Sequence, residues 1–263
     1  MIQVQRSTVS TLAASLIRVM PSLNPRDRAI QAMFDRIAAR YDVLNRVISF
    51  RCDRTWRNRA IEEVLKSGHP LILDLGAGTG DLTFSAARKL DGNGRIVGLD
   101  VSYEMLKLAR SKQSGAIHGE KTYFVQGSAM ASPFKDSIFD GVMTAFVLRN
   151  VSDLSLVFAH AFRVLKNGGR FVSLDMFPPS KNFFSAFYSL YFYRFVPWIG
   201  GLLAQDRVAY KYLAESVKSF HPPEKVTDLL AQAGFKDVKI RRFLNGAVCL
   251  HVAEKLNPAS RAS

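Results

Sequence analysis

The pattern of apolar and polar positions along the chain predicts strands separated by helices. Short apolar runs bounded by glycine, proline or polar clusters are typical of buried strands, and apolar residues three or four apart are typical of amphipathic helices. Strand-like runs lie near 71–75, 95–99, 121–125, 139–145 and 170–175. Because helical stretches separate them, we expect an α/β fold with a parallel, doubly wound sheet.

Two regions flank this alternating core. Residues 27–66 carry two helical patterns, which we expect to fold over a ligand as a lid. Phe34, Tyr41 and Asp42 are the residues best suited to touch the ligand, and the alternative for each is core packing or capping. Residues 177–232 separate the fifth strand from two last strands near 235–241 and 246–253. An insertion this long is uncommon in a compact domain unless it is functional, so it is predicted to cover the substrate.

The length of 263 residues fits one large domain. We expect an N-terminal arm at 1–26, a single domain at 27–255 and a C-terminal tail at 256–263. The arm contains no acidic residue, and it is interpreted either as a loosely ordered arm or as an organelle presequence.

An aromatic stripe from Phe184 to Phe195 lies within the insertion. It is either the buried face of a helix or a face that touches lipid or a hydrophobic tail. Arg194, Pro197 and Gly200-Gly201 interrupt the apolar run before the roughly 20 residues that a bilayer crossing requires. We therefore do not expect a transmembrane span here.

The first strand runs directly into a glycine-rich turn, Leu71-Ile-Leu-Asp-Leu-Gly-Ala-Gly-Thr-Gly80. Glycine adopts positive φ readily and lets a ligand approach the backbone, and the following helix offers free N–H groups. A dinucleotide site would need a third glycine at position 81, where this chain has Asp81. A carboxylate there suits an ammonium and a sulfonium, which predicts S-adenosylmethionine. The predicted contacts in this segment are Asp74, Gly76, Gly78, Thr79 and Gly80.

Asp100 ends the second strand-like run and can accept hydrogen bonds from ribose hydroxyls. NAD shares that ribose, so Asp100 alone does not identify the ligand. Ligands of a doubly wound sheet sit beyond the carboxyl ends of its strands. The same cleft should therefore include Ser128-Ala129 and the stretch from Thr144 to Asn150. The alternative is a structural glycine turn beside a capping or solvated aspartate.

The formal charge of +14 implies an anionic partner, either nucleic acid or an anionic membrane surface. Composition does not choose between them. Cys52 and Cys249 lie far apart and lack metal-binding spacing, so we expect no disulfide framework, no metal site and a reducing compartment.

Five stretches carry a resemblance that covers most of the chain. They are Phe34–Asp42, Leu73–Leu82, Leu148–Val151, Arg163–Lys166 and Tyr210–Ser216. In these the chain resembles the ubiquinone/menaquinone-biosynthesis C-methyltransferases. The resemblance implies a Rossmann-like class I methyltransferase sheet, mostly parallel with a C-terminal antiparallel strand. It also implies S-adenosylmethionine-dependent methylation of a ring carbon in a polyprenylated quinol, either demethylmenaquinol or 2-polyprenyl-6-methoxy-1,4-benzoquinol.

The resemblance places cofactor contacts on Thr79, Asp100, Ser128, Ala129 and Ala145. Two of these positions depart from the family pattern. Relatives commonly carry Asn or Asp at the position of Ser128 and often Ser at that of Ala145. Ser128 can still make one hydrogen bond, so we expect the side-chain contacts with adenine to be partly lost.

Alkylation of a quinol carbon requires an electron-rich ring, and removal of a phenolic proton makes the ortho carbon nucleophilic. A phenol has a pKa near 10, and a cation in a dry pocket favours the phenolate. Because arginine stays protonated, Arg149 is predicted to polarise a water or the phenolate, while Asn150 orients the ring oxygen. The reserve proton acceptors are His221, Tyr210 and Asp153. The alternatives are a salt bridge from Arg149 to a neighbouring helix and a structural role for His221.

Two other functions compete with this prediction. An RNA methyltransferase would suit the charge, but amino-directed enzymes usually carry Asn/Asp-Pro-Pro-aromatic after the fourth strand, where this chain has Ala145-Phe-Val-Leu-Arg-Asn150. Asp175-Met-Phe-Pro-Pro179 imitates that motif one strand later. The intact glycine loop and Asp100 argue against a non-catalytic scaffold.

The expected partners are therefore a membrane-resident quinol and an anionic membrane surface contacted peripherally, with no nucleic acid. We expect a cytoplasmic location, while organelle import and a homodimer both stay open.

Overall fold

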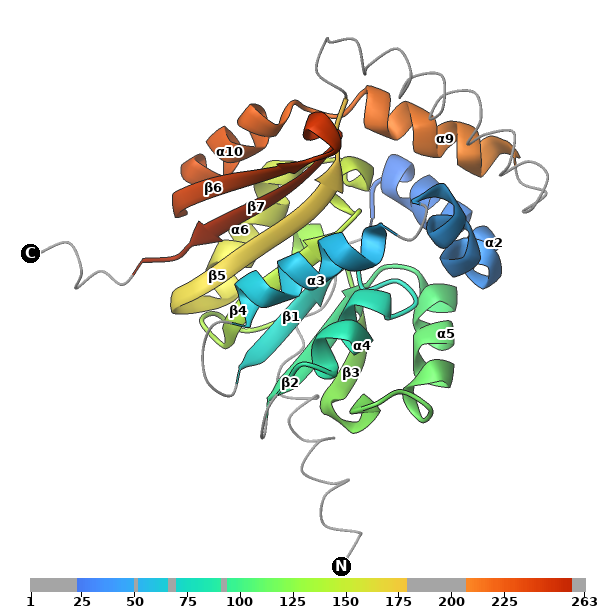
Figure 1. Cartoon of the computed structure of the whole chain (residues 1–263), viewed down its shortest axis with the longest axis horizontal. Coiled ribbons are helices and arrows are strands. Elements are labelled where there is room, and N and C mark those ends of the chain that lie inside the picture. The colour runs from blue at the N-terminus through green and yellow to red at the C-terminus, as the bar shows by residue number, and fades with distance from the viewer. Residues whose placement is uncertain (1–22, 50–51, 66–69, 91–93, 179–206, 257–263) are drawn as a thin grey trace, which may run out of the picture.

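The computed structural model describes residues 23–49, 52–65, 70–90, 94–178 and 207–256 (Figure 1). Within these residues one seven-stranded sheet has the order β3-β2-β1-β4-β5-β7-β6. The strands are β1 (Leu71–Leu75), β2 (Arg95–Asp100), β3 (Thr122–Gln126), β4 (Phe139–Ala145), β5 (Leu165–Met176), β6 (Lys236–Phe243) and β7 (Val248–Glu254).

Strand pairing confirms the predicted sheet. β1 pairs in parallel with β2 and β4, β3 extends the sheet beside β2, and β5 extends it beside β4. β7 is antiparallel to both β5 and β6. The strand order therefore reverses between β1 and β4, where a doubly wound sheet opens a crevice at the carboxyl ends of its strands.

β5 begins earlier than the strand-like run near 170–175 indicated. α6 ends at Val164, and β5 begins directly after it at Leu165. The register with β4 shifts between Phe139 and Gly141, so 166–169 form an irregular beginning of β5. The Gly168 N–H donates to the Lys255 carbonyl at 2.6 Å, which ties this segment to the chain that leaves β7.

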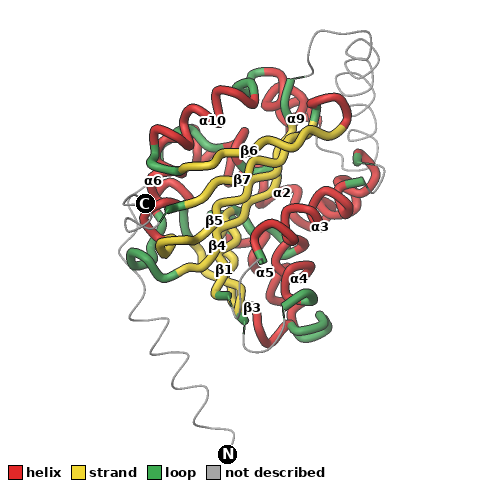
Figure 2. Tube along the Cα trace, turned by 60° about the vertical axis from the view of Figure 1, so that its left-hand side comes forward, coloured by secondary structure: helices red, strands yellow, loops and turns green. Residues whose placement is uncertain are grey.

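Helices cover both faces of the sheet (Figure 2). The helices are α2 (Pro25–Ile48), α3 (Asp53–Val64), α4 (Asp81–Ala87), α5 (Tyr103–Gln113), α6 (Leu154–Val164), α9 (Arg207–Lys218) and α10 (Pro223–Gln232), with short 3-10 turns η1 (Gly119–Lys121), η2 (Ala129–Ala131), η3 (Leu148–Asn150) and η5 (Leu244–Gly246). Side chains alternate between the two faces of each strand. Leu73 of β1 accordingly packs with α6 and α10, and Ile72 packs with α3 and α4.

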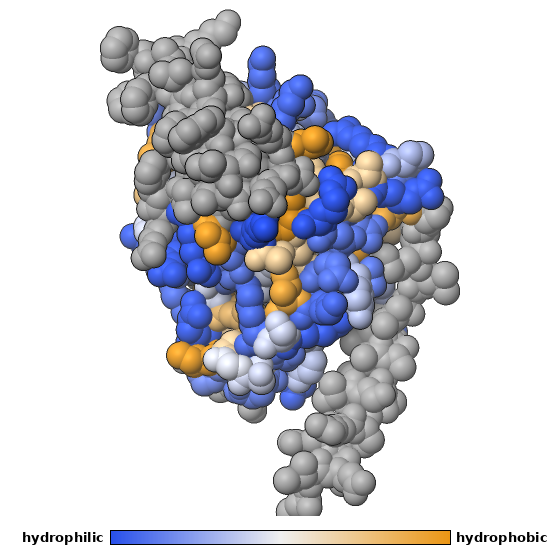
Figure 3. Space-filling view, turned by 90° about the vertical axis from the view of Figure 1, so that its right-hand side faces the viewer, coloured by the Kyte–Doolittle hydropathy of each residue, from blue (hydrophilic) through white to orange (hydrophobic). Residues whose placement is uncertain are grey.

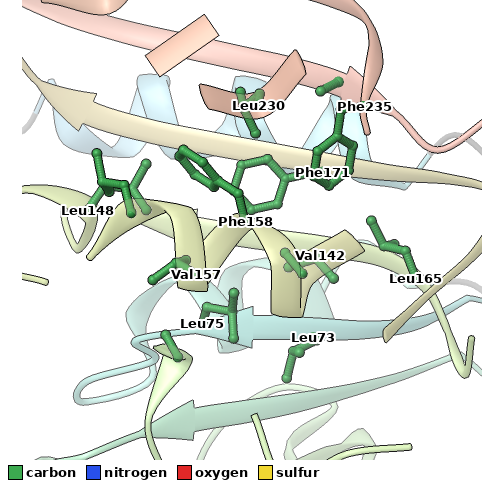
Figure 4. Packing of buried hydrophobic residues seen from close by; sticks show 14 of the residues in the cluster. Leu73, Leu75, Val142, Leu148, Val157, Phe158, Leu165, Phe171, Leu230 and Phe235 are labelled. Atoms are coloured by element: carbon green, nitrogen blue, oxygen red, sulfur yellow. The ribbon is translucent and has the colours of Figure 1, made fainter. Parts of the chain in front are cut away.

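The core against α6 is rich in aromatic rings. Phe158 of α6 and Phe171 of β5 lie side by side in Figure 4, with ring centroids 5.6 Å apart in an edge-to-face arrangement. Both are fully buried, and burial of each such side chain stabilises the fold by about 1.5–3 kcal/mol. This packing gives a rigid platform for the loops at the carboxyl ends of the strands.

The predicted lid at 27–66 divides into two parts. Trp56 and Ile61 of α3 are buried in the core on one face of the sheet, so α3 belongs to the sheet-covering layer. α2 instead packs against α5 and α9 through Met33, Ile37 and neighbours. α2 and α3 therefore belong to different layers of the fold.

Several predicted segments lie outside the described residues: the arm at 1–22, the aromatic stripe Phe184–Phe195 and the tail from 257. No described helix is both long and apolar enough to cross a membrane.

Candidate functional site

A cavity lies at the carboxyl ends of β1, β2 and β4, beneath α2. It encloses about 940 Å³ of space between atoms, counted out to its open mouth. Segments 76–79, 99–101, 127–130 and 145–147 line it from the sheet side, and Phe34, Tyr41 and Asp42 line it from α2. These strand ends meet in one site, as the sequence predicted.

The glycine loop presents bare backbone to this cavity. Gly76, Gly78 and Gly80 have φ values of 74°, 56° and 86°. A Cβ atom on Gly76 would lie 2.3 Å from Cγ2 of Val147, whereas a Cβ atom on Gly78 would meet nothing within 4 Å. Gly76 is thus needed for packing, and Gly78 leaves open space in which a ligand can approach the backbone. Gly80 does not line the cavity but forms the N-cap of α4.

Asp100 is held in place by two backbone donors. The Gly78 N–H donates to Oδ2 at 2.7 Å, and the Ser102 N–H donates to Oδ1 at 2.8 Å. Each carboxylate oxygen can accept a further hydrogen bond, which fits a pair of ribose hydroxyls. Burial raises the pKa of Asp100 to about 6, while the two backbone hydrogen bonds oppose that rise. The carboxylate is therefore ionised at neutral pH and protonates in mild acid.

Thr79 contacts α2 directly. Its Oγ1 donates to Oδ1 of Asp42 at 2.5 Å. The Lys112 ammonium donates to Asp42 and, at 3.2 Å, to the Thr79 carbonyl, and it lies 3.7 Å from Oδ1 of Asp81. Lys112 stands near the end of α5 with no local motif, so sequence reasoning missed it.

A second carboxylate of α2 holds the end of β2. Oδ1 of Asp35 accepts from Ser102 Oγ at 2.5 Å, and Ser102 also caps α5 by accepting from Met105 N at 3.1 Å. Asp35 and Asp42 are seven residues, or about two turns, apart, so they lie on the same face of α2. That spacing is the signal by which the sequence could have revealed this contact.

Three predicted cofactor contacts, Ser128, Ala129 and Ala145, line the cavity with little side-chain polarity. Ser128 Oγ accepts from Met130 N at 3.2 Å and so caps η2. Ala129 and Ala145 also line the cavity and offer no side-chain hydrogen bond. At these positions, where the sequence departs from the family pattern, the cavity wall therefore offers polar atoms mainly through its backbone groups.

Asp74 occupies a different place from the one predicted. It is fully buried in β1 and does not line the cavity. Oδ2 accepts from Thr83 Oγ1 at 2.6 Å, and burial raises the pKa of Asp74 to about 7. Asp74 therefore supports the glycine loop from below rather than facing a ligand.

Arg149 also differs from its predicted position. Its guanidinium is buried and donates to Oδ1 of Asp175 at 2.6 Å, and it does not line the cavity. The salt-bridge alternative is therefore what the structure shows, with a partner on β5 rather than on a helix. From the sequence, Asp175 was interpreted only as part of Asp175-Met-Phe-Pro-Pro179, which resembles the Asn/Asp-Pro-Pro-aromatic motif.

Asn150 does line the cavity. Its Nδ2 donates to the Phe146 carbonyl at 3.1 Å, which fixes the amide plane. Its Oδ1 is buried and accepts no hydrogen bond from the described residues. A buried acceptor without a donor is unfavourable, so this oxygen is suited to a hydroxyl of a ligand.

The reserve proton acceptors do not gather at the site. Asp153 is exposed and caps α6 by accepting from the N–H groups of Ser155 and Leu156 at 2.8 and 3.1 Å. His221 is exposed in the turn before α10. Tyr210 belongs to α9, but its side chain lies outside what the structure describes.

Asp27 is a carboxylate that sequence reasoning missed. It lies in the first turn of α2, is 7% exposed and lines the cavity. It accepts from Ser152 Oγ at 2.8 Å and from Asn24 Nδ2 at 2.6 Å. Asp27 and Asn150 both line this cavity, and Ser152, which donates to Asp27, comes two residues after Asn150.

The described residues contain no group of His, Cys, Asp or Glu side chains arranged to hold a metal ion. Cys52 is exposed, Cys249 is buried, and both are free.

Comparison with known proteins gives a consistent family. The profile of the ubiE/COQ5 methyltransferase family matches residues 22–255. A demethylmenaquinone methyltransferase of Thermus thermophilus is 40% identical over 223 residues, covering 85% of this chain and 100% of that protein. A ubiquinone/menaquinone biosynthesis C-methyltransferase of Geobacter sulfurreducens is 39% identical over 236 residues, covering 90% and 92%.

Solved structures support the fold. A Thermotoga maritima methyltransferase, described as a possible histamine N-methyltransferase, superimposes with a TM-score of 0.61 at 18% identity, covering 86% of this chain and 99% of that one. Phosphoethanolamine N-methyltransferase 2 of Haemonchus contortus, solved with S-adenosyl-L-methionine, gives 0.56 at 13% identity, covering 77% and 53%. At these identities the likeness concerns the fold alone.

Proposed function

The chain belongs to the ubiE/COQ5 methyltransferase family and is an S-adenosylmethionine-dependent C-methyltransferase of quinone biosynthesis, and we propose that it methylates a ring carbon of a polyprenylated quinol. Demethylmenaquinol is the first substrate to test and 2-polyprenyl-6-methoxy-1,4-benzoquinol the second. The observation that carries this proposal is the unpaired Asn150 oxygen beside apolar walls.

The polar end of the cavity fits S-adenosylmethionine. Asp100 offers two oxygens for the ribose, Gly78 leaves room at the backbone, and Asp81 faces the cavity at the start of α4. When bound, the cofactor supplies a methyl group activated by a sulfonium. The protein would hold it through Asp100, Asp81 and the backbone at Gly78.

The other end of the cavity fits an aromatic quinol. Ile30 and Phe34 of α2 line it together with Met130 and Val151, which gives apolar walls for a ring. We infer that one quinol hydroxyl donates to Asn150 Oδ1. Asp27 is the carboxylate at this end, and we assign to it the removal of the phenolic proton that makes the ortho carbon nucleophilic.

Arg149 has a positioning role in this proposal. Its pairing with Asp175 fixes the turn η3, and its guanidinium carbon lies 5.8 Å from the centre of the Phe146 ring. Removing one partner of such a buried pair leaves an uncompensated charge. Arg149 therefore holds the segment that presents Asn150, instead of meeting the phenolate itself.

The test is to incubate the protein with labelled methyl donor and each quinol, with total RNA as the competing acceptor. We expect label in the quinol fraction. Label in RNA would contradict the proposed acceptor, and label in neither fraction would favour a scaffold without catalysis.

We further propose peripheral contact with anionic membranes, because a polyprenylated quinol resides in the bilayer and the chain carries a charge of +14. Figure 3 views the side of α2, α5 and α9, where apolar side chains appear within a mostly hydrophilic surface. Each basic residue near an anionic surface contributes about 1 kcal/mol. The stripe Phe184–Phe195 lies outside the described residues, so its part in this contact is purely a proposal from sequence.

Vesicle co-sedimentation at low and high ionic strength tests this contact. Wild type and the double variant Phe187→Ser/Tyr191→Ser should both bind anionic vesicles at low salt. Salt should release the variant more completely if the stripe inserts. Identical behaviour would leave charge alone as the cause, and no binding at low salt would contradict the membrane proposal.

A further inference from the structure

Arg57 is a buried charge that is short of hydrogen-bond acceptors. It lies in α3, is 8% exposed, and its Nε is buried without a hydrogen bond. Its ion-pair partner among the described residues is Asp53, whose Oδ2 lies 3.5 Å from that Nε. A guanidinium has five N–H donors, and a buried charge is normally hydrogen-bonded. The Arg57 guanidinium can therefore form hydrogen bonds with a bound anion.

Arg57 also faces the cofactor cavity. It lines the cavity at the carboxyl ends of the strands together with Gly76, Ala77 and Gly78. Its guanidinium carbon is 5.1 Å from the centre of the Phe146 ring. Its positive charge acts on Asp74 beneath the glycine loop, where it opposes the rise in the pKa of that carboxyl. The guanidinium thus sits beside the glycine loop, on the β4 side.

Strand order decides which part of the cofactor reaches this place. Ser128 follows β3, Asp100 ends β2, and the glycine loop follows β1, in the order β3-β2-β1-β4. A cofactor with its adenine near Ser128 and its ribose on Asp100 extends past the glycine loop toward β4. Its amino-acid end therefore comes to Arg57 and Asp81, which both line the cavity.

We propose that Arg57 binds the α-carboxylate of the methionine part of S-adenosylmethionine, while Asp81 faces its α-ammonium. A guanidinium and a carboxylate can form two parallel hydrogen bonds. The two side chains would then match both charges of a zwitterion. This inference rests on the use of S-adenosylmethionine and is independent of which quinol accepts the methyl group.

Asp53 positions Arg57 in this arrangement. Ser49 Oγ donates to Oδ1 of Asp53 at 2.7 Å, and Asp53 is one helical turn before Arg57. Ser49 lies just after α2, so the contacts Ser49–Asp53–Arg57 connect the segment that leaves α2 with the carboxylate site. An Asp53 variant should therefore weaken the same ligand contact less than an Arg57 variant does.

The test compares two ligands that differ in the amino-acid part. S-adenosylhomocysteine carries the carboxylate, and 5′-methylthioadenosine lacks the whole amino-acid group. In calorimetric titrations, Arg57→Gln should weaken S-adenosylhomocysteine binding by about 10- to 100-fold and leave 5′-methylthioadenosine binding within about twofold. Arg54→Gln, an exposed arginine of the same helix, is the matched control and should change neither affinity.

An equal loss for both ligands would show that Arg57 is structural, and an unchanged affinity for S-adenosylhomocysteine would show that it is not a contact. If Arg57→Gln does not fold, the proposal can still be tested with the wild-type protein and an altered ligand. S-adenosylhomocysteine with its carboxylate converted to a neutral amide should then bind about 10- to 100-fold more weakly than the parent, and equal binding would overturn the proposal. No quinol enters these titrations, so their outcome is separate from the acceptor assignment.

Discussion

The two ends of the cavity are built in different ways. At the cofactor end, Asp100 already accepts two backbone hydrogen bonds, and Thr79 is bonded to Asp42. At the acceptor end, Asn150 Oδ1 has no donor, and the nearby walls are mostly apolar. The first end is fixed by hydrogen bonds within the protein, whereas in the proposed complex the second end gains a hydrogen bond from the ligand. Variants at the two ends should therefore fail in different measurements.

The largest expected effect is on turnover at the acceptor end. Asp27→Asn keeps the shape of the side chain but removes the proton acceptor, so kcat with quinol should fall by about 10²- to 10⁴-fold. Binding of the methyl donor should stay within about twofold of wild type. Asp153→Asn is the matched control, because that carboxylate caps α6 away from the cavity. Near-normal turnover of Asp27→Asn would remove it as the base.

The next effect concerns the support of the acceptor end. Asp175→Ala leaves the buried Arg149 unpaired, so the free energy of unfolding in urea should fall by about 3–5 kcal/mol. The double variant Arg149→Met/Asp175→Leu should recover most of that loss, because it removes both charges together. A single variant as stable as wild type would show that the pair does not hold this segment.

At the cofactor end the expected loss is in binding. Asp100→Ala removes acceptors for the ribose and should weaken donor affinity by about 1.5–3 kcal/mol, with a much smaller change in kcat at saturation. Asp74→Asn tests the neighbouring aspartate, which does not line the cavity, and should change donor affinity less. Donor affinity of Asp100→Ala within twofold of wild type would contradict the ribose assignment.

The smallest effect is a pH dependence of donor binding. The pKa of Asp100 is raised to about 6, and ribose hydroxyls bind its ionised form, so donor affinity should fall as the pH drops from 7 toward 5. Asp100→Asn should lose this dependence, whereas Asp74→Asn should retain it. Affinity of wild type that does not change over this range would show that Asp100 is not the titrating acceptor.

The raised pKa values of Asp74 and Asp100 also predict a pH dependence of folding stability. Stability should fall as the pH rises, whereas donor affinity should rise. The pKa values of Asp74 and Asp100, about 7 and about 6, are raised above the reference value of 3.8. The folded state therefore binds protons more tightly than the unfolded state. Their contribution to stability is present below about pH 4 and is lost as the pH rises through 6 to 7. Urea unfolding of wild type and of Asp74→Asn across this range measures it.

The residues proposed for the cofactor end could be selected from the sequence because their signals are local. Gly76 and Gly78 have positive φ in a glycine-rich turn, and Asp100 ends a strand, so each can be interpreted from its immediate neighbours. The acceptor end depends on distant pairing. Arg149 meets Asp175 because β5 lies beside β4, and Asp27 reaches Ser152 from another helix. No local pattern distinguishes these contacts from exposed or capping roles.

The attachment of α2 to both strand ends has a kinetic consequence. In the proposed complex the cofactor lies beneath α2, so we expect it to leave when Asp35 and Asp42 release Ser102 and Thr79. These contacts lie on one face of a single rigid helix, so they should break together rather than one after the other. Exchange of spent for fresh cofactor would then proceed at the rate at which α2 opens. Loosening either aspartate should shorten the residence time of S-adenosylhomocysteine more than it changes the rate of methyl transfer.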